Sequence, residues 1–100
     1  MSPLPVEFHP RAIVDAREAR RWYARRSRAA ANRFMAELGR VMEQIAATPD
    51  RWPPHILGTR FYRVRRFPYL VVYRNLVDRV QVIAVAHGRR RPDYWRARIS

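Results

Sequence analysis

The sequence has 100 residues, which is enough for one domain with a modest core and too few for two. Its apolar share of 48%, including 12% aromatic residues, excludes a chain that is too polar to fold. There is no cysteine, so disulfides and cysteine-ligated metal sites are also excluded.

The formal net charge is +13, and all 21 basic residues are arginines. The excess lies in the second half, where residues 51–100 carry 12 arginines against 2 acidic residues. Such a field favours a nucleic acid, an acidic protein or an anionic membrane surface as a partner, without choosing among them. No apolar run approaches the roughly 20 residues that span a bilayer, and the N-terminus lacks the features of a signal peptide. We therefore expect a cytoplasmic location.

The first half of the chain predicts one strand and two helices. Residues 4–9 alternate apolar and polar side chains and predict a short strand, after which Pro10 suits the first position of a helix. Apolar residues at helical spacing predict an amphipathic helix over residues 11–26, with Asp15 and Glu18 on its other faces. Ser27 marks a break or an N-cap. The second helix has the clearest period of the sequence and ends at Thr48 and Pro49; its stripe steps by 4, 4, 3 and 4 residues through Ala30, Phe34, Leu38, Val41 and Ile45.

Three segments of the second half, 59–67, 69–75 and 79–87, are rich in β-branched and aromatic residues and predict strands. Short connections between them favour an antiparallel meander, and the nearly continuous apolar run from Val80 to Ala86 indicates a central strand. The predicted fold class is α+β, with an N-terminal strand and a two-helix hairpin packed on a mainly antiparallel sheet. The three-stranded meander completes this sheet, a basic C-terminal tail follows, and residues 1–100 form a single domain.

The order of these elements, together with FPYLVVYR (67–74) and VIAVAHGRRRPDYW (82–95), resembles the RelE/ParE superfamily of toxins from type II toxin-antitoxin systems. The similarity covers nearly the whole chain and looks most like the ParE-like branch. It implies a cognate antitoxin as a partner, with no cofactor, no metal and no membrane. ParE-like toxins act on DNA gyrase, whereas RelE-like toxins cut messenger RNA on the ribosome.

The two branches give the same residues different roles. In the ParE-like interpretation the protein is not an enzyme, and the resemblance implies target binding by Arg63, Arg65, Arg89, Arg90, Arg91, Tyr94 and Trp95. In the alternative, a RelE-like ribosome-dependent endoribonuclease, it implies catalysis by Arg63, Arg65, His87, Arg89 and Tyr94. By their side-chain chemistry, His9 and His55 are more remote candidates for proton transfer.

One position departs from the RelE-like pattern. Leu70 stands where that pattern has an arginine, and an aliphatic side chain cannot neutralise the phosphate of a transition state. Leu70 and the AHGRRRPDYW ending therefore favour the gyrase-binding interpretation. The sequence also leaves open a toxin with another target and an inactive toxin.

Several of these residues also have a purely structural interpretation. Arg63 and Arg65, two apart on a predicted strand, would share one face that is either a site or simply solvated. His87 either caps the turn at Gly88 or transfers protons, and Trp95 is expected to pack on the sheet as a C-terminal latch. Trp22 and Trp52 are expected to pack or to contact the antitoxin. We expect the far side of the sheet and the C-terminal extension to present clustered guanidinium groups.

Overall fold

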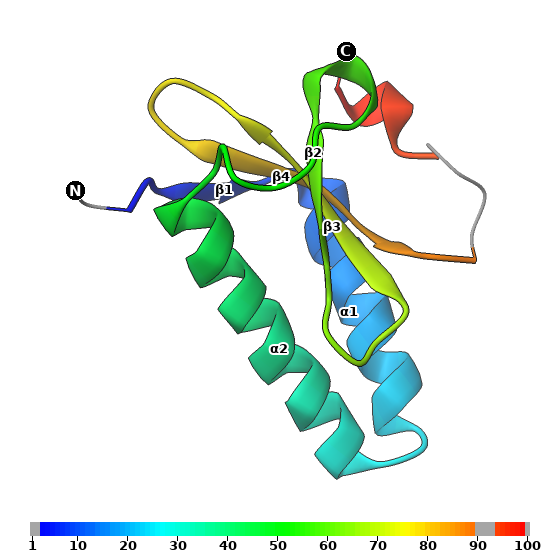
Figure 1. Cartoon of the computed structure of the whole chain (residues 1–100). Helices are drawn as coiled ribbons and strands as arrows, with labels where there is room; N and C mark the ends of the chain where they lie inside the picture. Colours follow the sequence, from blue (N-terminus) through cyan, green and yellow to red (C-terminus); the bar gives the residue numbers. More distant parts are fainter. Residues whose placement is uncertain (1–2, 90–93, 100) are drawn as a thin grey trace.

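The computed structural model describes residues 3–89 and 94–99. Its elements are β1 (Val6–Phe8), α1 (Pro10–Ala24), α2 (Arg28–Ala47), β2 (Arg60–Arg63), β3 (Tyr69–Asn75) and β4 (Val80–His87), with short 3-10 helices at Ile56–Gly58 and Arg96–Arg98. The strands form one sheet in the order β1-β4-β3-β2, and the helices form a hairpin against it (Figure 1). The predicted α+β fold and its antiparallel meander are confirmed. Among the described residues, no helix is both long and apolar enough to cross a membrane.

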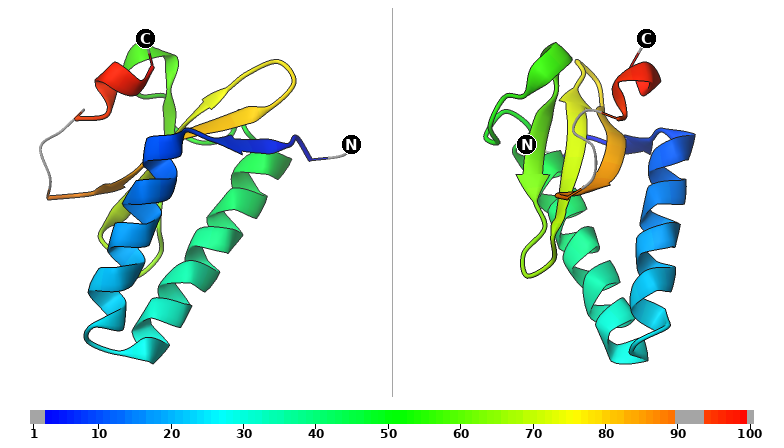
Figure 2. Two further views of the ribbon diagram at one scale, coloured as in Figure 1. Left: turned by 180° about the vertical axis from the view of Figure 1, so that it is seen from behind. Right: turned by 90° about the vertical axis from the view of Figure 1, so that its right-hand side faces the viewer.

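Side-chain caps begin both helices. The Nδ1 atom of His9 accepts a hydrogen bond from the Arg11 amide at 3.0 Å, and Pro10 occupies the first turn of α1. The Oγ atom of Ser27 accepts from the Ala30 amide at 3.2 Å, so the predicted N-cap is confirmed. The two helices then run antiparallel from a short turn (Figure 2).

The main core lies between the helical hairpin and the sheet. The α2 stripe predicted from the 4-4-3-4 spacing supplies Phe34, Leu38, Val41 and Ile45, all of which are buried. The ring of Phe34 stacks on Tyr23, with centroids 5.3 Å apart and an interplanar angle of 28°. The sheet contributes residues such as Val71 and Val82 to this cluster, which covers one face of the meander.

The strand predicted over residues 59–67 is shorter, because β2 ends at Arg63. Val64 is buried, and its amide donates to the Tyr69 carbonyl at 2.9 Å to begin the turn into β3. Arg66 then adopts a left-handed backbone with φ of 70°, which no strand residue has. Arg65 lies in this turn, so the expectation that Arg63 and Arg65 share a strand face is wrong.

Strand β4 contains a β-bulge at Ile83. Val72 pairs with Ala84 and Tyr73 pairs with Val82, so Ile83 is an extra residue opposite β3. The bulge explains the continuous apolar run, because Val80, Val82 and Val85 join the core under the helices while Ile83, Ala84 and Ala86 belong to a second cluster.

This second cluster covers the outer face of the sheet and corrects the expectation of a basic far side. Val72 follows Val71 in β3, and consecutive strand residues point to opposite faces. Trp95 belongs to this cluster together with Val72 and Ile83, and Tyr94 and Ile99 pack against it. The centre of the far side is therefore apolar and covered by the C-terminal segment 94–99.

Candidate target-binding surface

Exposed arginines lie at one end of the sheet, which we call the arginine end; they are Arg63, Arg65, Arg66 and Arg89. Pairing within the sheet brings them to the same end. The Gly88 amide donates to the Pro68 carbonyl at 2.7 Å, which joins the segment after β4 to the β2–β3 turn. Arg66 belongs to this group although the sequence argument did not select it, because only the turn at the end of β2 reveals its position.

The guanidinium groups of the arginine end form no hydrogen bond or ion pair with any residue in 3–89 or 94–99. Other arginines do have carboxylate partners, such as Arg79 with Glu7 at 3.0 Å. The arginine end is thus an exposed positive field without an internal counter-charge within those residues. Arg90 and Arg91, which the sequence also selects, lie outside the described residues.

Two aliphatic residues, Leu70 and then Ala86, follow Arg63 across the sheet. Leu70 pairs with Arg63 on one side and with Ala86 on the other. The position that carries an arginine in the RelE-like pattern therefore presents an apolar side chain between β2 and β4.

His87 has a structural role at the end of β4. Its Nδ1 atom accepts a hydrogen bond from the Arg89 amide at 3.0 Å, which caps the turn at Gly88. Its ring meets Tyr69 edge-on, with centroids 5.0 Å apart. The capping interpretation of His87 is confirmed, and the hydrogen bond fixes the ring beside the arginine end.

Tyr94 and Trp95 lie away from the arginine end. Trp95 is only 2% exposed, and its ring lies 5.8 Å from that of His55, which confirms the predicted latch. The Tyr94 hydroxyl donates to Oδ2 of Asp15 at 3.2 Å. In this arrangement the indole of Trp95 is inaccessible to a target.

Asp15 is the centre of a buried hydrogen-bond network that the sequence did not predict. Arg98 donates from Nη1 to Oδ2 of Asp15 at 2.6 Å and from Nη2 to Oδ1 at 3.1 Å. The same carboxylate accepts from the Val85 amide at 3.1 Å, and Arg98 also donates to the Ile83 carbonyl at 3.0 Å. Burial lowers the pKa of Arg98, but the hydrogen bonds and charge of Asp15 outweigh it, so the net pKa is raised.

This network completes the edge of β4 that β1 leaves open. The pairing of β1 with β4 ends at Val82, where the chain turns into α1. Beyond it, the Ile83 carbonyl and the Val85 amide would be unpaired, and a buried unpaired backbone group is costly. Asp15 and Arg98 satisfy both groups and tie the C-terminal segment to α1.

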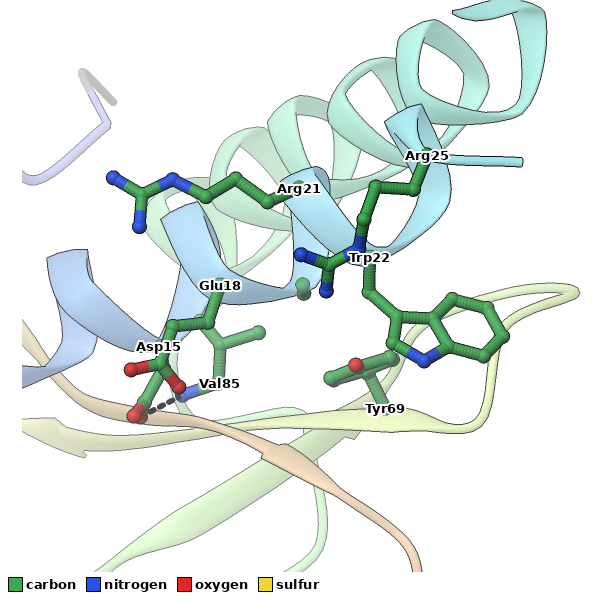
Figure 3. A pocket seen from close by; sticks show the side chains of 8 residues that line it. Asp15, Glu18, Arg21, Trp22, Arg25, Tyr69 and Val85 are labelled. Atoms are coloured by element: carbon green, nitrogen blue, oxygen red, sulfur yellow. Dashed lines mark hydrogen bonds between the residues drawn. The ribbon is translucent and has the colours of Figure 1, made fainter. Parts of the chain in front are cut away.

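A cleft of about 300 Å³ continues along this edge, between α1 and β4 (Figure 3). Arg21 and Arg25 project over it from α1, and Trp22 and Tyr69 lie at its far end, away from Asp15. The cleft thus has Asp15 and Glu18 at one end, with the guanidinium group of Arg21 above them, and Arg25, Trp22 and Tyr69 at the other (Figure 3).

A second cleft lies beyond Trp22 and is lined by Trp22, Tyr23, Pro68, Tyr69, His87 and Arg89. Trp22 is 43% exposed, and the guanidinium of Arg26 lies 3.5 Å from the centre of its ring. This cation–π pair extends the arginine end with an aromatic surface. Trp52, in contrast, packs against the core, with its ring 4.3 Å from that of Tyr62.

The side chains that line these clefts suit the binding of a partner. Among the described residues, no group of three or more His, Cys, Asp or Glu side chains could hold a metal ion. Exposed guanidinium groups and aromatic rings recognise anionic and aromatic groups of a partner.

A helical hairpin packed on a four-stranded mixed sheet is the α+β fold that the resemblance implies. The family model described as "ParE toxin of type II toxin-antitoxin system, parDE" matches residues 6–92. The chain therefore belongs to the ParE toxin family of type II toxin-antitoxin systems.

A solved structure supports the fold independently. The chain is similar to one from the "Chromosomal ParDE TA system from P. aeruginosa", with a TM-score of 0.74 and 12% sequence identity. The match covers 84% of this chain and 95% of that one. No sequence among the curated proteins matches this chain.

Proposed function

We propose that this toxin inhibits DNA gyrase in the cytoplasm by protein contact, that the arginine end is its target-binding surface, and that a cognate antitoxin neutralises it. The observation that carries the proposal is the set of exposed guanidinium groups without counter-charges in residues 3–89 and 94–99. Exposed charges contribute little to stability, so the fold does not account for their concentration there. Binding to a charged surface of a partner would account for this concentration of arginines.

The separation of the residues favours binding over RNA cleavage. The nuclease alternative needs Tyr94 near Arg63 so that proton transfer and charge stabilisation act on one phosphate. Tyr94 donates to Asp15 beside the open edge of β4, whereas Arg63 lies on β2, two strands away across the sheet. Two strand spacings amount to roughly 10 Å. Leu70 lies between them and offers no charge.

Two assays on the purified toxin test the target. We expect inhibition of gyrase supercoiling, or accumulation of the cleaved gyrase–DNA complex, and no cuts in messenger RNA on programmed ribosomes. Ribosomal cuts with unaffected gyrase would transfer the assignment to the nuclease alternative.

Charge removal tests the surface. Replacing Arg63, Arg65 and Arg89 by alanine should abolish gyrase inhibition and leave the fold intact, because all three side chains are exposed and exposed charges contribute little to stability. A matched control removes the same charge from exposed positions in the helices, at Arg11, Arg20 and Arg28, and should retain activity. Equal loss in both variants would mean that only net charge matters.

Expression tests the toxin-antitoxin assignment. The chain should be toxic when produced alone and harmless together with a small acidic protein encoded beside it, because a +13 surface favours a counter-charged partner. Harmless expression alone, together with no partner in a pull-down from the native operon, would refute it.

A further inference from the structure

Trp22 lies between the two clefts described above and lines both of them, as Tyr69 also does. The clefts have volumes of about 300 and 340 Å³. Tyr69 is only 8% exposed, whereas the indole of Trp22 is 43% exposed and projects beside it (Figure 3). A large aromatic ring between two hollows is therefore accessible to a partner. We call this ring and the two clefts the Trp22 site.

Arg26 holds the ring of Trp22 in place. Its guanidinium lies 3.5 Å from the centre of the ring, and its Nη1 atom donates to the Trp22 carbonyl at 3.1 Å. The Arg26 side chain is thereby fixed at two points to the residue four positions before it. The Trp22 site is arranged before any ligand arrives, which lowers the ordering cost of binding.

Cationic side chains flank the ring. Arg25, three positions after Trp22, lines the first cleft, and Arg89 lines the second. Neither guanidinium forms a hydrogen bond or an ion pair with any residue in 3–89 or 94–99. None of the described residues that line the second cleft is acidic. An aromatic ring with guanidinium groups on both sides matches the alternation of planar bases and phosphates in a single nucleic-acid strand.

We propose that the Trp22 site binds an unpaired segment of DNA, with one base stacked on Trp22 and the flanking phosphates on Arg25 and Arg89. The source of that segment, DNA opened within the gyrase complex, rests on the function proposed above. The chemistry of the ligand follows from the site itself.

The shape of the site favours an unpaired strand over a duplex. In a duplex the faces of the bases are covered by their neighbours in the stack, so that they cannot reach a ring between two hollows. A duplex would offer phosphates to the arginines, and the indole would gain no contact. An unpaired strand can turn one base toward the indole while its phosphates stay near the guanidinium groups.

An acidic protein segment accounts for less of the site. Carboxylates would pair with Arg25 and Arg89 but would leave Trp22 without a planar partner. His87 adds a polar group to the second cleft. Because its Nδ1 atom accepts from the Arg89 amide, the neutral ring carries its proton on Nε2 and can donate there to a base or a phosphate.

The acidic side chains of the first cleft set the direction of the strand. Asp15 and Glu18 lie at the end of this cleft away from Trp22 (Figure 3). Carboxylates repel phosphates and offer them no hydrogen-bond donor. We therefore expect the strand to run from Trp22 toward Arg89 and the arginine end.

Anisotropy of a fluorescently labelled oligo(dT) strand, titrated with the purified toxin, measures the binding. Trp22→Ala should weaken it about tenfold or more, because stacking of one base on an aromatic ring has that magnitude. Trp22→Phe keeps a ring and should retain most of the affinity. Phe8→Ala is the matched control: Phe8 is 37% exposed on β1 and lines neither cleft, so binding should be unchanged.

The salt dependence of binding tests the phosphate contacts. Arg25→Ala should weaken binding and reduce the slope of log K against log salt concentration by about 0.7, the value for one phosphate of a single strand. Arg20→Ala removes the same charge from an exposed position of α1 outside both clefts and should leave the slope unchanged. Equal reductions in both variants would overturn the proposal, because net charge alone would then attract the strand.

Further outcomes separate this proposal from the proposed function. A toxin that inhibits gyrase but binds oligo(dT) no better than a duplex, or no better than Trp22→Ala does, would overturn the Trp22 site alone. Binding of oligo(dT) that depends on Trp22, by a toxin that leaves gyrase unaffected, would support the site and refute the proposed function. Tighter binding of oligo(U) than of oligo(dT) would overturn the assignment to DNA.

Discussion

Asp15 and Arg98, 83 positions apart in the sequence, form a buried two-point ion pair that joins α1 to the C-terminal segment. Their side chains are 6% and 10% exposed. The pair also satisfies the Val85 amide and the Ile83 carbonyl, so it holds together three parts of the chain. The C-terminal segment is thus part of the folded domain rather than a solvated basic tail.

Replacing Arg98 by methionine should destabilise the protein strongly. Asp15 would remain buried without its counter-charge, and breaking a buried pair in this way costs about 3–5 kcal/mol. Urea denaturation followed by circular dichroism measures the loss. Arg79→Met is the control, because Arg79 pairs with exposed Glu7 and Asp78, and its denaturation midpoint should hardly change. Similar midpoints for both variants would contradict a structural role for the network.

Trp95 should behave as a core residue rather than as a target contact. Trp95→Ala removes a side chain that is 2% exposed and should cost about 3–5 kcal/mol of unfolding free energy. Trp22→Ala, at a position 43% exposed, should cost much less. The same urea titrations compare the two, and a stable Trp95→Ala toxin that no longer inhibits its target would return Trp95 to the binding surface.

Tyr73 should make stability fall in alkaline solution. Burial raises the pKa of Tyr73 from its ordinary value of 10.0 to about 12, with a further rise from Asp50 and an opposing effect of Arg60. Its contribution is therefore fully present below pH 10. Between pH 10 and about 12 the unfolded chain releases this proton and the folded chain keeps it, so stability decreases.

Guanidinium chloride denaturation between pH 8 and 11 measures this decrease. The slope from Tyr73 should approach about 1.4 kcal/mol per pH unit above pH 10. Tyr73→Phe removes the ionisable group and should flatten the curve by that amount. It also removes the 2.7 Å hydrogen bond to the Pro49 carbonyl, so the variant should be less stable at pH 8. An unchanged slope would show that Tyr73 ionises equally easily in both states.

Ser27 should contribute a helix cap. Ser27→Ala removes the oxygen that accepts from the Ala30 amide and should cost about 1 kcal/mol. Ser27→Asp can still cap the helix and should restore most of the stability. Thermal unfolding of the three proteins provides the comparison, and equal Tm values for Ala and Asp would argue against the cap.

The sequence predicts elements best where one period dominates. The α2 stripe from Phe34 to Ile45 and the cap at Ser27 are confirmed, because both signals are local. At the start of the stripe Ala31 is buried, whereas the predicted Ala30 is only half-buried. The predicted end of β2, at residue 67, is wrong. The strand stops earlier because Val64 is buried in the core and Arg66 has a left-handed backbone, and local propensity indicates neither. The bulge at Ile83 was not predicted, since every side chain of that run is apolar on either face.

The candidate site was likewise predictable from the sequence only in part. Arg63, Arg65 and Arg89 could be selected from charge and resemblance, and the structure places them at one end of the sheet. Asp15 was assigned to a polar face, yet Ala12, Asp15 and Ala19 are spaced three and four apart and form the buried stripe of α1. That spacing was the available signal for a buried carboxylate. Its partner, Arg98, has no sequence signal, because nothing local distinguishes it from the other arginines.

The extra residue at Ile83 constrains how the length of β4 can vary. Removing one residue between Val80 and Ile83 would reverse the inward and outward positions on one side of the deletion. Either the valines under the helices would turn outward, or the backbone groups held by Asp15 and Arg98 would turn toward β3. Related chains that keep both contacts should therefore tolerate substitutions in this strand far better than insertions or deletions.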